Sequence, residues 1–80
     1  MKLPRDVSGH ELAKLLRAFQ YAITRQAGSH IRLTTQLNGE HHITIPNHSS
    51  LRMGTLAHIL GDVAFHFKLT RDELYQRLFG

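Results

Sequence analysis

The chain has 80 residues, of which 41% are hydrophobic, and ten Lys and Arg against six Asp and Glu give it a net charge of +4. This length predicts one domain with a thin core, and the hydrophobic content favours a globular chain over a disordered tail. No apolar run approaches the roughly 20 residues that span a bilayer, no signal peptide is recognisable, and the chain has no cysteine. We therefore expect a single cytoplasmic domain over residues 1–80, with no membrane contact and no disulfides. The positive charge favours polyanionic partners.

The first predicted element is a helix over residues 9–20. Ser8 and Glu11 have the spacing of a capping box, in which each side chain bonds the backbone N–H of the other residue. The apolar residues that follow lie on one stripe at helical spacing: Leu12, Leu15, Leu16 and Phe19. Such a stripe is typical of a helix that packs on a hydrophobic core.

Three stretches of alternating apolar and polar residues come next, at 21–25, 29–35 and 41–46. Pairing Ile23 with Ile31 leaves residues 26–28 as a three-residue loop that ends in glycine. Loops of this length favour glycine at the last position, because glycine adopts a positive φ without strain. The loop between the second and third stretches ends in glycine as well. The sequence thus predicts a three-stranded antiparallel sheet.

This register separates the two faces of the sheet. One face is expected to be covered by helices and carries Tyr21, Ile23, Ile31, Leu33, Ile43 and Ile45. The other is polar and open and carries Thr24, His30, Arg32, Thr34, His42 and Thr44. His30 lies on the middle strand opposite Pro46, after which the chain leaves the sheet, so we expect His48 to approach it. Arg25 has the parity of the covered face, and we expect it to escape at the end of the sheet.

Two more helices complete the chain. The apolar spacing predicts a long helix that begins between residues 52 and 55 and runs to Phe67. Thr70 and Glu73 repeat the capping-box spacing and predict a short helix to about Leu78. The fold class is therefore α+β, an α-β-β-β-α two-layer sandwich with an extra short C-terminal helix.

Several residues stand in an order that points to one family. They are Leu12, Leu15 and Leu16, then Tyr21 and Arg25, the run Gly28-Ser29-His30, the run Ile43-Thr44-Ile45-Pro46, and Gly54, Thr55, Leu56, Ile59 and Leu60. In this order the chain, over about residues 1–69, resembles the HicA (YcfA-like) family of toxins. The resemblance implies a double-stranded-RNA-binding-domain-like fold and a toxin that cleaves mRNA without a metal or another cofactor. It also implies a HicB-type antitoxin partner that covers the active face.

The resemblance places the active-site histidine in the Gly-Ser-His run, which here is His30. RNA carries its own nucleophile, the ribose 2′-hydroxyl, so an enzyme needs a base, an acid and positive charge near the phosphorus. We expect His30 to be the base. The family often has a basic residue before the glycine, and this chain has Ala27 there. The other expected site residues are His48 as a second acid or base, Arg25 and Arg32 as phosphate contacts, and Gly28, Ser29 and His42 as further RNA contacts.

Two other functions remain open from the sequence. The chain could be an RNA-binding module that recognises duplex shape without cutting, or a domain that binds only protein through its sheet edges. His58, Asp62 and His66 have a helical spacing that suits a metal ion, but ion pairs on the helix surface explain it as well. We therefore predict no metal site.

Overall fold

The computed structural model describes residues 2–80. Its elements in chain order are α1 (Gly9–Leu15), the 3-10 helix η1 (Leu16–Phe19), β1 (Ala22–Ala27), β2 (His30–Thr35), β3 (His41–Pro46), α2 (Met53–Phe67) and α3 (Arg71–Phe79). The predicted α+β class and the α-β-β-β-α order with an extra C-terminal helix are confirmed. Within the described residues, no helix is both long enough and apolar enough to cross a membrane.

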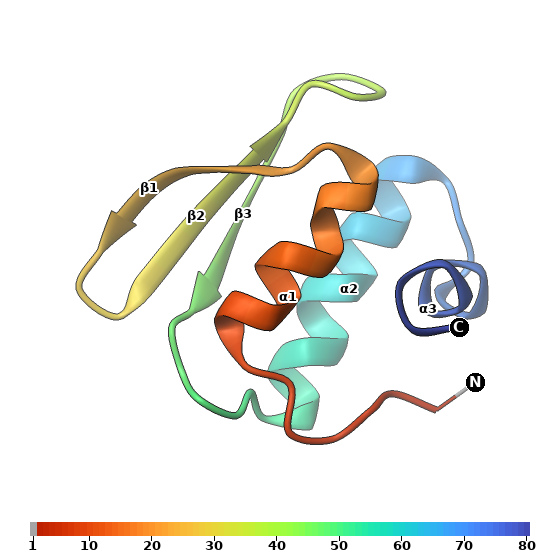
Figure 1. Ribbon diagram of the computed structural model, residues 1–80. Helices are drawn as coiled ribbons and strands as arrows, with labels where there is room; N and C mark the ends of the chain where they lie inside the picture. The colour runs from red at the N-terminus through yellow and green to blue at the C-terminus, as the bar shows by residue number, and fades with distance from the viewer. Residues whose placement is uncertain (1) are drawn as a thin grey trace.

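The strands form one antiparallel sheet in the order β1-β2-β3. Helices α1 and α2 lie side by side against one face of this sheet, and α3 packs on the side of the helices that is turned away from it (Figure 1). The opposite face of the sheet carries no helix (Figure 1). One face of the sheet therefore belongs to the core, and the other is available to solvent.

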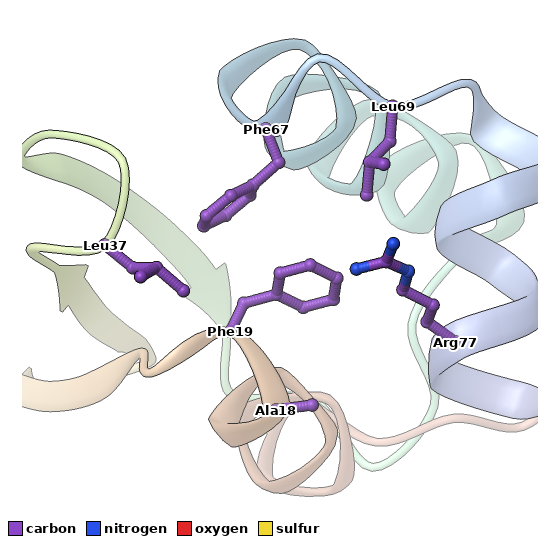
Figure 2. Close-up of a pocket in the computed structure, with 6 residues that line it drawn as sticks. All are labelled: Ala18, Phe19, Leu37, Phe67, Leu69 and Arg77. Atoms are coloured by element: carbon purple, nitrogen blue, oxygen red, sulfur yellow. The ribbon is translucent and has the colours of Figure 1, made fainter.

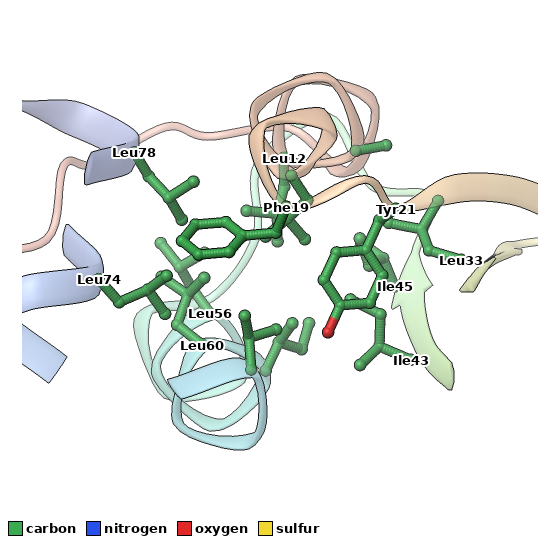
Figure 3. Close-up of a cluster of buried hydrophobic side chains, with 14 of the residues drawn as sticks. Leu12, Phe19, Tyr21, Leu33, Ile43, Ile45, Leu56, Leu60, Leu74 and Leu78 are labelled. Atoms are coloured by element: carbon green, nitrogen blue, oxygen red, sulfur yellow. The ribbon is translucent and has the colours of Figure 1, made fainter. Parts of the chain in front are cut away.

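The core lies between the sheet and the helices, as Figure 3 shows. The sheet contributes Leu33, Ile43 and Ile45, and Leu12 and Phe19 come from the first helical segment. The other labelled members are Tyr21 at the entrance to β1, Leu56 and Leu60 on α2, and Leu74 and Leu78 on α3. These side chains are almost completely buried, so the apolar stripes read from the sequence form one cluster.

Both predicted capping boxes are present. At α1 the Ser8 hydroxyl accepts from the Glu11 backbone N–H at 3.0 Å, and the Glu11 carboxylate accepts from the Ser8 N–H at 3.2 Å. Thr70 and Glu73 make the same reciprocal pair at α3. The hydrogen bonds from Thr70 hold the pKa of the Glu73 carboxyl below its ordinary value, because they favour its charged form. The starts of α1 and α3 are thus set by local sequence, whereas α2 begins without a side-chain cap.

The second hairpin has the predicted register, with Leu33 opposite Ile43 and Ile31 opposite Ile45. The first hairpin does not. Ile23 lies opposite Leu33, whereas the sequence predicted Ile31, and the turn is the two-residue Gly28-Ser29. Gly28 has φ 57°, which suits the first central position of such a turn. The shorter turn leaves one residue too many in β1, and the strand accommodates it as a β-bulge between Ile23 and Arg25.

Ile23 was expected in the covered face, and that prediction is wrong, because its side chain is 47% exposed. It lies on the edge strand β1, where it lines a hollow of about 120 Å³ with the α1 residues His10, Ala13 and Lys14. The other five residues expected on that face are buried. The helices therefore cover β2 and β3 more completely than β1.

A three-residue hydrogen-bond chain attaches the sheet to α2. His41 lies within 3.2 Å of the Asp62 carboxylate through Nε2 and within 2.7 Å of the Tyr21 hydroxyl through Nδ1. Since a carboxylate only accepts, Nε2 donates to Asp62, and in the tautomer that has its proton on Nε2 the Nδ1 atom accepts from Tyr21. Burial raises the pKa of the Tyr21 hydroxyl, and the nearby Asp62 carboxylate raises it further. These hydrogen bonds join the start of β1, the start of β3 and the middle of α2.

The start of α1 lies directly on the end of β3. The Gly9 backbone N–H donates to the His48 carbonyl at 3.0 Å, and a Cβ at Gly9 would overlap the Pro46 carbonyl oxygen. A residue larger than glycine would have to push the helix away from the strand. Glycine is thus required at position 9 because α1 approaches the end of β3 closely. The backbone conformation is not the reason, since the φ of Gly9 is not positive.

We expect Tyr21→Phe to lower the free energy of unfolding by about 1–3 kcal/mol near neutral pH, because Nδ1 of His41 loses its donor.

The Tyr21 phenol should also make the free energy of unfolding fall at alkaline pH. The pKa of the Tyr21 hydroxyl is higher in the folded protein than in the unfolded chain, where it is about 10. The stability that the neutral phenol contributes is therefore complete below about pH 10 and is lost as the pH rises beyond that value. Urea titrations at neutral and strongly alkaline pH test this. Wild type should lose more stability between the two conditions than Tyr21→Phe does, and equal losses would contradict the assignment.

Gly9→Ala and Gly54→Ala form a matched pair on two helices. The first should destabilise the protein by about 1–3 kcal/mol through overlap with the Pro46 carbonyl. The second adds a methyl group that meets no atom within 4 Å, and alanine favours the helix by up to about 1 kcal/mol. Denaturant midpoints should therefore move in opposite directions. Midpoints that move the same way would show that the approach of α1 to β3 tolerates a Cβ.

Candidate functional site

The open face of the sheet has a hollow of about 250 Å³ around His30. It is lined by Arg25 and Ala27 from β1, His30 and Arg32 from β2, and Thr44 from β3. His30 is exposed, at the first position of the middle strand. Thr44 was expected on this face but not as a site residue, and its pairing with Arg32 was the signal that could have identified it. Three predicted site residues, Arg25, His30 and Arg32, thus come together.

Arg25 reaches this hollow because of the bulge. In a regular strand Thr24 would lie opposite Arg32, and Arg25 would point toward the helices. The extra residue shifts the pairing so that Arg25 itself lies opposite Arg32. Thr24 stays on the open face too, where its hydroxyl is 3.0 Å from the Thr34 hydroxyl. The expectation that Arg25 escapes at the end of the sheet is therefore corrected: it joins the polar face within β1.

The two arginines form a concentration of positive charge without compensation. Within residues 2–80, neither Arg25 nor Arg32 takes part in an ion pair. Like charges that lie directly opposite each other on two strands destabilise a sheet. An anion placed between them would remove this repulsion and would accept hydrogen bonds from both guanidinium groups. The arrangement is therefore suited to a phosphate group, which would lie beside the His30 imidazole.

The turn next to His30 is held by the end of β3. The Asn47 backbone N–H donates to the Ser29 carbonyl at 2.7 Å. Gly28, at the tip, leaves open space where a side chain would begin. This bond brings the segment after β3 beside the turn, and His48 is exposed there. His48 does not line the hollow at His30, so its predicted part in the chemistry stays a prediction.

His42 lies on the same face but farther along the strands, opposite Thr34. Its Nε2 donates to the Glu40 carboxylate at 2.7 Å, and its Nδ1 accepts from the Thr34 hydroxyl at 2.7 Å. Both ring nitrogens are therefore occupied within the chain. An RNA contact by His42 would use the face of the ring, by stacking, and would not use a nitrogen.

A second hollow, of about 310 Å³, is different in kind (Figure 2). Its lining is apolar except for Arg77, whose guanidinium lies 5.9 Å from the centre of the Phe19 ring, a cation–π distance. The apolar residues are Ala18, Phe19, Leu37, Phe67 and Leu69. The hollow has an arginine but no acid or base for proton transfer, so it is a weaker candidate for an active site.

The three residues of the predicted helical stripe, His58, Asp62 and His66, do not share a common partner. Asp62 bonds His41 of β3, and Nε2 of His66 donates to the Leu37 carbonyl at 3.0 Å. The described residues contain no group of three or more side chains placed to hold a metal ion. The ion pairing expected along this stripe instead joins α2 to the sheet.

Comparison with known families gives one match. The family model for the HicA toxin of bacterial toxin–antitoxin systems matches residues 9–64, which is more than half of the chain. The chain belongs to the HicA toxin family. The matched region runs from the start of α1 into α2 and includes the whole sheet with its arginine-lined hollow. Searches of curated proteins and of solved structures returned no match.

Membership in the HicA family makes this protein the toxin of a toxin–antitoxin system, with an antitoxin as its partner. The match ends within α2, so α3 lies outside it. The expected resemblance to this family is confirmed.

Proposed function

We propose that this HicA toxin is an endoribonuclease that cleaves mRNA in the cytoplasm without a metal ion. The observation that carries the proposal is that Arg25 and Arg32, which have no ion-pair partner among the described residues, lie at paired strand positions and line one hollow with the exposed His30. A phosphodiester between the two guanidinium groups would bring its ribose against the imidazole. Family membership supports RNA as the substrate.

In the proposed reaction His30 removes the proton from a ribose 2′-hydroxyl. The 2′-oxygen then attacks the adjacent phosphorus, the bond to the 5′-oxygen breaks, and that oxygen takes up a proton. The products are a 2′,3′-cyclic phosphate and a 5′-hydroxyl. Arg25 and Arg32 stabilise the negative charge that grows on the non-bridging oxygens. They supply the positive charge that Ala27, at a position often basic in the family, does not.

We assign the proton on the leaving oxygen to His48. Support comes from the hydrogen bond between Asn47 and Ser29, which joins residues adjacent to the two histidines. Gly28 and Ser29 would let the RNA backbone approach the turn closely, because no side chain fills the space at Gly28. His42 would add a stacking contact. A HicB-type antitoxin would inhibit the toxin by covering this face.

His30→Ala tests the proposal. Loss of the base should reduce RNA cleavage by at least about 100-fold, and cleavage by wild type should survive EDTA. RNA binding, measured with a labelled single strand, should persist because the arginines remain. His10→Ala is the matched control, since His10 is an exposed histidine on α1, away from the open face.

Two results would contradict the proposal. Cleavage by His30→Ala at the wild-type rate would remove His30 from the chemistry. If the intact chain binds RNA and never cuts it, even with its antitoxin absent, the protein is a non-catalytic RNA-binding module.

A further inference from the structure

Phe65 is the most exposed of the large hydrophobic side chains that the structure describes, with 86% of its surface accessible. It lies near the end of α2, on a side of the helix that the core does not use. An aromatic ring so fully in water costs solvation free energy and does nothing for folding. It is also far from His30, because it lies near the loop between β2 and β3, at the opposite end of β2.

Two hollows meet at Phe65. One, of about 620 Å³, is lined by Asn38, His41, Asp62, Phe65, His66 and Lys68. The other, of about 480 Å³, is lined by His58, Gly61, Asp62, Phe65 and Arg71. Phe65 is the only apolar side chain of any size in either lining. The ring therefore stands between polar recesses, with no apolar surface around it.

The polar groups of the larger hollow are held in place by one another. His66 donates to the Leu37 carbonyl at 3.0 Å, and the Asn38 side-chain amide donates to the His66 carbonyl at 2.9 Å. The His66 ring also stacks on the His41 ring, with centroids 4.4 Å apart. These contacts fix the loop against α2. They also hold the part of the wall formed by Asn38, His41 and His66 in place before any ligand arrives.

Cations flank the ring on both sides. Lys68 follows α2 and lines the first hollow. Arg71 lines the second, where it donates to the Ala57 carbonyl at 2.8 Å and rests on α2 at Gly61, a position with no side chain to block it. Asp62 is the acidic residue among those that line the two hollows, and it already accepts a hydrogen bond from His41. Its carboxylate can also accept from the exocyclic amine of a base.

We propose that Phe65 is a stacking platform for an unpaired base of single-stranded RNA, with Lys68 and Arg71 contacting the flanking phosphates. An aromatic face with adjacent cations is what binding of unpaired nucleotides requires. A protein partner fits less well, since the centre of a protein interface is a contiguous apolar patch. This inference rests on the proposed function, because it adds a second contact for the same RNA substrate.

The chain has no tryptophan, so Phe65→Trp creates a single fluorescent reporter at the site. In a His30→Ala background, which leaves the RNA intact, a single strand of about 12 nucleotides should quench the indole by stacking. Met53→Trp in the same background is the control. Met53 is also exposed on α2, about 18 Å away along the helix, and its indole should not respond. Inorganic polyphosphate, which has no bases, should leave both reporters unchanged.

Phe65→Ala should weaken RNA binding about tenfold, because one stacked base is lost. The inference is overturned if RNA binds Phe65→Trp without quenching it, or if only the antitoxin protein quenches it. The proposed function is judged separately, by whether the Met53→Trp variant with His30 present cuts RNA. A protein that cuts RNA but gives no signal at Phe65 loses this inference alone, whereas one that neither binds nor cuts RNA loses both.

Discussion

A single unpaired residue in β1, Thr24, decides which side chains β1 presents on the open sheet face. The bulge it creates sets Arg25 opposite Arg32, and both side chains line the hollow that contains His30. This pairing costs stability, because no carboxylate of the described residues neutralises either charge. An anion bound between the two positions would offset this cost. The proposed cleavage of RNA depends on this one irregularity.

The rest of the fold keeps that face rigid without taking part in it. The hydrogen bonds among Tyr21, His41 and Asp62 attach the start of β3 to α2. The close approach of Gly9 to Pro46 holds the end of β3 against α1. Between these two attachments, β2 and β3 have a regular register. The covered face thus supplies stability, and the open face is free to carry charge. If Phe65 stacks a base, the RNA would continue past the edge of β3 toward α2.

Much of this arrangement follows from local sequence. Both capping boxes and the second hairpin could be read directly, because each depends on residues close together in the chain. The register of the first hairpin could not be read in this way. Its apolar pairing was compatible with a three-residue loop, and the structure instead has a two-residue turn with a bulge, which leaves Ile23 about half exposed. The position of His30 was still predicted correctly, because it depends on the pairing of β2 with β3. The position of Arg25 was predicted wrongly, because it depends on the first hairpin. The contact of His41 with Asp62 was missed because it joins a strand to a helix 21 residues away.

The most direct test of the account is an NMR titration of the toxin with a non-cleavable 2′-deoxy dinucleotide, which carries one phosphate. We expect the largest chemical-shift changes at Arg25, Ala27, His30, Arg32 and Thr44, with the two arginine side chains responding together at the same ligand concentrations. Changes at Arg32 and His30 without Arg25 would contradict the claim that the bulge assembles the site. Changes confined to the helical side of the molecule would contradict the claim that the open sheet face binds phosphate.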